Sequence, residues 1–261
     1  MSRTLTARMG GLLLAVAGTA LTMAAQAPVE SSNETRFQLD LKVPDAALAK
    51  YLPTGFAPNV AVQGAARDCN LRVVFIDRVS IHGMDNRPLG RGSNRLVYLV
   101  APVKDTTGMN AQLVIGGLTE DSSDAPGPFG NYLAATTHTM QRSTTSPTTG
   151  NGAVTDAQDW VFAAATGETL ELHIKYEKGV GNRGNPTETK FYSAKTPAFY
   201  QISKQEQVLD ILRNVTTAPP DRVKEFTFKG TGGSYASLFD GTDKVLSWDN
   251  ILWINRTILV P

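Results

Sequence analysis

One strand-like segment of the sequence carries an ionisable side chain on a face that is otherwise apolar. In Leu71–Ile81 successive side chains alternate between two faces, as they do in a β-strand. Asp77 lies on the apolar face, between Phe75 and Val79. A carboxylate in such surroundings must be paired, or its pKa must rise until it is neutral. Groups of that kind are frequent at functional sites, so Asp77 is our candidate acid–base residue, with Phe75 and Val79 beside the ligand.

Asp77 also has a purely structural interpretation. A turn or an arginine, for example Arg36 or Arg95, can satisfy a buried carboxylate, and an arginine would lower its pKa instead of raising it. Both arginines are therefore candidate ligand-binding residues as well as candidate partners of Asp77.

A second polar stripe consists of Glu171, His173 and Lys175, which alternate with apolar residues in Thr169–Tyr176. Ionisable residues on one face of a strand usually mark the solvent side of a sheet. In a barrel with a wet lumen the same stripe would line a pocket, so these three residues are also candidate ligand-binding residues.

Standard catalytic and metal-binding motifs are absent from the sequence. The three histidines, His82, His138 and His173, do not form a metal-ligand pattern, and the lone Cys69 excludes an internal disulfide or a cysteine zinc cage. Gly232–Ala236 resembles a nucleophile elbow, but no histidine follows it in the chain. No glycine-rich phosphate loop is present either. We therefore expect neither a metal nor a cofactor.

The elements that must position these residues are predicted to be mainly β-strands. Period-2 runs bounded by turn residues are typical of an antiparallel sheet or barrel. The predicted strands are Phe37–Val43, Leu71–Ile81, Leu96–Lys104, Ala111–Leu118, Trp160–Ala165, Thr169–Tyr176, Arg222–Lys229, Ser234–Phe239 and Ile251–Val260.

Two short helices are predicted beside the strands. Asp45–Leu52 ends at Pro53, and Ser203–Val215 begins with a capping box and continues with an apolar stripe. The Thr/Ser-rich stretch 136–159 and the Gly-rich stretch 178–189 are predicted to be irregular loops. The fold class is therefore mainly β (α+β), in one domain.

The N-terminus is predicted to be an export signal. Arg3 and Arg8 precede the uncharged apolar stretch Gly10–Met23, and small residues follow it, so residues 1–27 form a secretory signal peptide and residues 28–261 the mature domain. We expect a periplasmic or secreted protein with no membrane contact in its mature form. With 25 Lys+Arg against 24 Asp+Glu, the chain is near neutral, which argues against nucleic-acid binding.

Several segments resemble the acetoacetate decarboxylase family. Phe37–Pro53 is similar to its opening strand and helix, and Val74–His82 to a strand with an acidic residue five before a histidine, which would match Asp77 to a site residue. Arg95–Gly117 resembles the two strands before the catalytic loop, and Ser234–Asp240 with Ile258–Pro261 the closing elements. The resemblance implies an antiparallel β-barrel, a small-molecule ligand and a homo-oligomer.

The sequence departs from this family at its reactive group. The family decarboxylates through a lysine Schiff base, but Leu118–Phe129, where the lysine pair belongs, contains no lysine. The family's site arginine falls on Glu34 or, with slippage, on Arg36.

Three functions remain open. The protein acts on a small carbonyl or carboxylate compound by acid–base chemistry at Asp77, or it binds an apolar or amphipathic ligand without turnover. A third alternative is an interaction protein that presents residues 136–159 to a partner.

Export gives a direct test. N-terminal sequencing of the secreted protein should begin between residues 25 and 30, because Ala25 and Ala27 are equal candidates for the cleavage site. An intact Met1 on protein from the cytoplasmic fraction would contradict this prediction.

Overall fold

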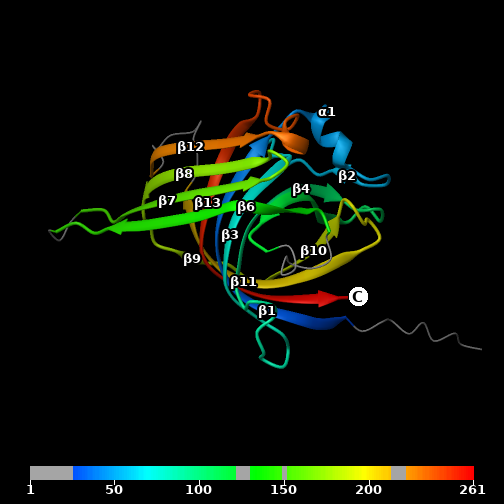
Figure 1. Ribbon diagram of the computed structural model, residues 1–261, viewed down its shortest axis with the longest axis horizontal. Helices are drawn as coiled ribbons and strands as arrows, with labels where there is room; N and C mark the ends of the chain where they lie inside the picture. The colour runs from blue at the N-terminus through cyan, green and yellow to red at the C-terminus, as the bar shows by residue number, and fades with distance from the viewer. Residues whose placement is uncertain (1–25, 122–129, 149–151, 213–221) are drawn as a thin grey trace, which may run out of the picture.

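The computed structural model describes residues 26–121, 130–148, 152–212 and 222–261, most of which form β-strands (Figure 1). The mainly β fold class is confirmed. The strands are β1 (Ala27–Lys42), β2 (Ala57–Pro58), β3 (Leu71–His82), β4 (Asn94–Lys104), β5 (Asn110–Thr119), β6 (Tyr132–Thr145), β7 (Thr155–Ala164), β8 (Thr169–Glu177), β9 (Asn182–Arg183), β10 (Thr187–Ser193), β11 (Tyr200–Leu212), β12 (Val223–Thr231) and β13 (Lys244–Val260).

The helical segments are short. The predicted helix at Asp45–Leu52 is present as α1 (Asp45–Leu48), followed by the 3₁₀ turn η1 (Ala49–Tyr51). A further 3₁₀ turn, η3, spans Gly233–Tyr235. None of the helices in the described ranges has the length and hydropathy to cross a bilayer.

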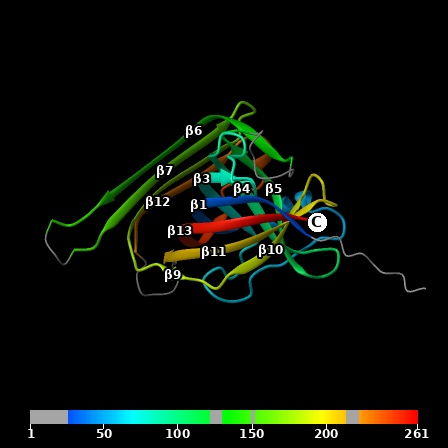
Figure 2. The same ribbon diagram turned by 90° about the horizontal axis from the view of Figure 1, so that it is seen from below.

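Seven of the described strands close into a barrel, in the order β5-β10-β11-β13-β1-β3-β4, with β4 pairing back onto β5 (Figures 1 and 2). All of these neighbours are antiparallel except β10 and β5. β1 lies between β3 and β13, so two segments far apart in the chain, Ala27–Lys42 and Lys244–Val260, are paired in the barrel wall.

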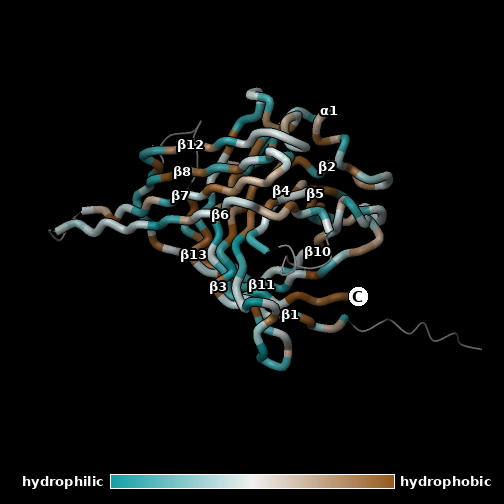
Figure 3. The backbone as a smooth tube through the Cα atoms, in the orientation of Figure 1, coloured by the Kyte–Doolittle hydropathy of each residue, from teal (hydrophilic) through white to brown (hydrophobic). Residues whose placement is uncertain are grey.

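A second sheet, β12-β8-β7-β6, joins the barrel where Gly117–Thr119 of β5 pairs with residues 132–134 of β6. The main apolar core lies between this sheet and the outer face of the barrel: Phe75 of β3, for example, contacts Trp160 of β7 with ring centroids 5.9 Å apart. Figure 3 shows apolar and polar residues alternating along several strands. On β1, Phe37, Leu39 and Leu41 are in the core, and Arg36 and Gln38 between them line the cavity.

The predicted helix at Ser203–Val215 is wrong. Residues up to Leu212 belong to β11, which pairs with β10 on one side and with β13 on the other; residues 213–215 lie outside the described ranges. These two ladders satisfy the backbone groups along the strand, and tertiary pairing of this kind overrides local helix propensity. The residues that mimic a capping box also alternate with period 2, which is the pattern that the barrel uses.

The predicted strand at Ser234–Phe239 is also wrong, because this segment begins with η3 and continues as turns. Its function in the fold is to anchor the wall. The Tyr235 hydroxyl accepts a hydrogen bond from Gly117 N at 2.7 Å and donates one to Gly117 O at 3.2 Å. A Cβ on Gly116 would lie 2.7 Å from the same hydroxyl oxygen, so only glycine allows this approach.

The expectation of a loop over residues 136–159 is wrong as well. Residues 132–145 and 155–164 form the antiparallel pair β6–β7, whose register runs from Ala135↔Ala164 to Thr145↔Thr155. Threonine is a good strand former, so a Thr-rich composition does not by itself indicate a loop. Residues 178–189 are largely irregular, as expected, apart from β9 and the start of β10.

Candidate functional site

The barrel lumen holds the candidate site. On β1 the even-numbered residues from Glu34 to Asp40 face the lumen, while the odd-numbered residues from Phe37 to Leu41 are buried in the core toward the second sheet. A cavity of about 230 Å³ lies inside, a size that suits a metabolite better than a larger ligand. Its polar lining includes Arg36, Gln38, Arg72, Tyr98, Gln112, Gln205, Gln207 and Asp249.

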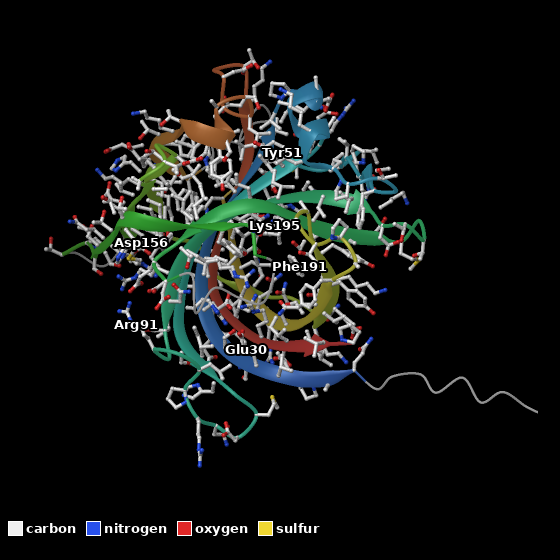
Figure 4. All side chains as sticks on the ribbon, turned by 45° about the vertical axis from the view of Figure 1, so that its right-hand side comes forward. Glu30, Tyr51, Arg91, Asp156, Phe191 and Lys195 are labelled. Carbon is white, nitrogen blue, oxygen red and sulfur yellow. The ribbon has the colours of Figure 1, made fainter. Side chains whose placement is uncertain are left out.

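Tyr98 and Phe191 also line a second, much smaller chamber of about 20 Å³, which Arg256 and Tyr132 border. The two chambers are therefore adjacent parts of one lumen. Figure 4 shows Phe191 within the ring of barrel strands, whereas Arg91 lies at the outside of the molecule.

Three arginines surround one carboxylate at this end of the lumen. Glu34 is 1% exposed and accepts a hydrogen bond from Arg36 Nε at 2.7 Å. Arg256 Nη2 lies 2.6 Å from Glu34 Oε1, and Arg78 Nε lies 3.4 Å from the same oxygen. Glu30, at the rim, pairs with Arg78 and with Arg256.

This arginine cluster (Glu30, Glu34, Arg36, Arg78, Arg256) contains one more guanidinium than carboxylates. Burial alone would raise the pKa of Glu34, but the charges of Arg256, Arg36 and Arg78 outweigh burial and hold it below its usual value, so the carboxylate is ionised. Burial and the neighbouring Arg256 lower the pKa of Arg78. Arg78 Nη1 is buried and has no hydrogen-bond partner among the described residues. The cluster is electrostatically complementary to a small anion.

The other charged end of the lumen is neutralised locally. Asp40 accepts hydrogen bonds from Arg72 Nε at 3.1 Å and from Ser247 Oγ at 2.6 Å. Arg36, by contrast, lines the cavity beside a second hydrogen-bond donor, the Tyr98 hydroxyl. Arg36 Nη1 donates to this hydroxyl at 3.3 Å. An anion in the cavity is therefore best placed against Arg36 and Tyr98.

Asp77 does not lie in the lumen. Asp77 and Phe75 lie on the same outer face of β3. The second sheet covers this face at Phe75 but not at Asp77 and Val79, and Val79 is 59% exposed. Arg95 Nε lies 3.2 Å from Asp77 Oδ1 in a surface pocket, so the expected partner is confirmed, while the apolar surroundings are wrong. The side chains of β3 alternate as predicted. However, the face that carries Phe75 and Asp77 is turned to the core and to solvent, and not to the cavity.

The stripe of Glu171, His173 and Lys175 also lies outside the lumen, on the solvent side of β8. His173 Nδ1 lies 2.6 Å from Asp159 Oδ1, and this hydrogen bond raises the pKa of His173. Lys175 Nζ donates to Glu225 at 2.8 Å. These contacts connect the strands of the second sheet and do not face a cavity.

Of the residues selected from the sequence, Arg36 is the one that the structure places at the cavity. Arg78, Arg256, Tyr98 and Gln205 were missed. The alternation along β3 places Arg78 on the opposite face from Asp77, and this opposite face is the one that is turned to the lumen. A usable signal is the run of polar residues at alternate positions of the first strand, from Glu34 to Asp40, because a polar face on a strand that lies in the middle of a sheet indicates a wet lumen.

The residues that line the cavity do not include a lysine amine. All lysines of the sequence fall in the described ranges, and none of them lines the cavity. Within those ranges no group of three or more His, Cys, Asp or Glu residues is arranged to hold a metal ion. The ionisable groups at the cavity are those of Arg36, Arg72, Tyr98 and Asp249.

Replacing Glu34 tests the arginine cluster. Glu34→Gln removes the buried carboxylate that contacts all three guanidiniums, so the free energy of unfolding in urea at pH 7 should fall by about 3–5 kcal/mol. Because the folded-state pKa of Glu34 is lowered, its contribution exists above the unfolded pKa, and the difference between variant and wild type should shrink as the pH falls below about 4.5. Exposed Glu225→Gln is the control, with a change within about 0.5 kcal/mol. Equal effects of the two substitutions would contradict the prediction.

Known structures provide an independent comparison. The sequence matches no protein-family model and no curated protein. Among solved structures, the enduracididine biosynthesis enzyme MppR with HEPES bound has a TM-score of 0.56 at 10% identity, over 93% of this chain and 89% of that one. MppR complexed with pyruvate has a TM-score of 0.54 at 10% identity, over 92% and 91%. An acetoacetate decarboxylase-like enzyme from Sphingomonas wittichii RW1 has a TM-score of 0.54 at 11% identity, over 96% and 97%. The chain therefore has the acetoacetate decarboxylase-like fold over most of its length.

Proposed function

We propose that this protein is exported and binds a small organic monoanion, a carboxylate that also carries a carbonyl group, in the lumen of its barrel. The observation that carries the proposal is the arginine cluster, in which three guanidiniums are buried with Glu34 and Arg36 lines the cavity. These buried guanidiniums favour an anionic ligand, because a carboxylate accepts charge-assisted hydrogen bonds from them.

The cavity lining favours a polar ligand over the apolar or amphipathic one that the sequence left open. Four glutamine side chains and two arginines border the cavity, and they would lose hydrogen bonds to water against an apolar ligand. A neighbour of the same fold, MppR, is known in complex with pyruvate, which is a small carboxylate with an adjacent carbonyl. Pyruvate is therefore the first probe for this chain.

Acid–base chemistry is the form of turnover that the cavity supports. Asp249 supplies a carboxylate as the base, and the Tyr98 hydroxyl, which accepts from Arg36, can donate its proton to a ligand oxygen. A base together with an oxygen-directed donor suits proton abstraction from the carbon beside a carbonyl. Asp77 would have to act from outside the cavity, so Asp249 is the better candidate.

Binding should depend on Arg36. Arg36→Gln should weaken pyruvate binding, measured by titration calorimetry, by about 10- to 100-fold, since a hydrogen bond to a charged group contributes about 1.5–3 kcal/mol. Arg95→Gln and Asp77→Asn, at the outer surface pocket, should leave the affinity unchanged. If Asp77→Asn lost binding and Arg36→Gln kept it, the prediction would be wrong and the ligand would bind at Asp77.

Proton exchange of the bound ligand distinguishes binding from turnover. In D₂O, proton NMR of pyruvate with wild-type protein should show exchange of its methyl protons, and Asp249→Asn should stop the exchange while binding is kept. If the wild-type protein binds pyruvate without exchange of its methyl protons, the protein binds this ligand but does not turn it over.

No Schiff base should form. Because no lysine lines the cavity, borohydride reduction in the presence of acetoacetate or pyruvate should leave every lysine unmodified in the intact mass and the peptide map. A reduced adduct on any lysine, for example Lys104 or Lys175, would show that the reactive amine lies elsewhere in the fold.

A further inference from the structure

One edge of the second sheet has no neighbouring strand among the described residues. β6 pairs with β7 from Ala135 to Thr145, but it pairs with β5 only over residues 132–134. Figures 1 and 2 show β6 and β7 extending together away from the barrel, with β6 at the margin of the sheet. Alternate backbone N–H and C=O groups of residues 137–145 therefore point away from β7, where an added strand could pair with them.

The two edges of this sheet differ in how they are protected against such pairing. Natural edge strands commonly carry lysine, proline or other features that disfavour an added strand. β12, at the opposite edge, has Lys224, Glu225 and Lys229. The β6 edge from Thr137 to Thr145 has neither lysine nor proline; its protective feature is a bulge at Thr136, which precedes this segment.

The one arginine of the β6 edge is paired with a buried carboxylate. Arg142 Nη2 donates to Asp156 Oδ2 at 2.8 Å, and Thr144 Oγ1 donates to Asp156 Oδ1 at 2.5 Å. Asp156 is fully buried and also accepts from the Tyr176 hydroxyl at 3.3 Å. The projecting strand is thus fixed by buried hydrogen bonds, and a fixed edge loses little conformational freedom when another strand is added.

We propose that β6 pairs antiparallel with β6 of a second copy of this chain across a two-fold axis, which joins two second sheets into one. A two-fold interface places the same surface patch on both partners, so the patch must tolerate itself. This segment does, because it is a row of Thr, Ser, Gln, His and Met side chains whose one arginine is already paired with Asp156. The near-neutral chain adds little long-range repulsion between copies.

Charging the edge tests the proposal. In the full mature protein, wild type should sediment as a dimer at about 50 μM, and the double variant Thr139→Lys, Gln141→Lys should sediment as a monomer, because it places like charges opposite one another across the new pair. Thr139 and Gln141 are exposed, so thermal melting of the monomer should match that of other surface variants. Thr227→Lys on exposed β12 is the matched control and should leave the dimer intact.

Hydrogen exchange gives a second readout that needs no variant. Amides of residues 137–145 should exchange more slowly as the protein concentration rises through the dimerisation range, while the β12 amides should not change. A monomeric wild type at 50 μM, a dimer that persists in the double variant, or concentration-independent exchange of this segment would each overturn the proposal.

Discussion

The Glu34 carboxylate holds three guanidinium groups inside a barrel that could not otherwise bury them. Isolated arginines at such low exposure would cost several kcal/mol each, and the charges of Glu34 and Glu30 offset most of this cost. Within this cluster the guanidiniums outnumber the carboxylates by one, and the carboxylate of Asp249 lies at the adjacent cavity. The contacts that allow these arginines to be buried are therefore also the ones on which the proposed binding of an anion depends.

Each barrel strand must serve two environments at once. Phe37 and Leu39 of β1 pack in the core toward the second sheet, and Arg36 and Gln38 between them face the cavity. A shift of pairing by one residue would exchange these faces, placing arginine in the apolar core and phenylalanine in the lumen. The bulge between Asn33 and Glu34 in the β1–β3 pair lies where the strand passes from the rim to the arginine cluster.

Much of this fold is predictable from the sequence, because period-2 patterns locate most of the strands and their buried faces. The Ser203–Val215 segment was misassigned because its residues satisfy both helical and strand periodicity, and only pairing with β10 and β13 decides between the two. The site was harder for a related reason. Alternation shows that Asp77 and Arg78 point to opposite sides, but which side becomes the lumen depends on barrel closure between β4 and β5. Arg36 was identified by resemblance, whereas Arg78 and Arg256 come together only through strands far apart in the chain.

The pairing of the first strand with the last has a kinetic consequence. β1 can form its ladder with β3 early, but its other edge stays open until β13, which ends at Val260, has been made. Contacts of such large sequence separation slow folding, since the loop must close before they stabilise the chain. The nascent chain is thus unable to seal its barrel, or to bring Arg256 to Glu34, until the residues of β13 have been made.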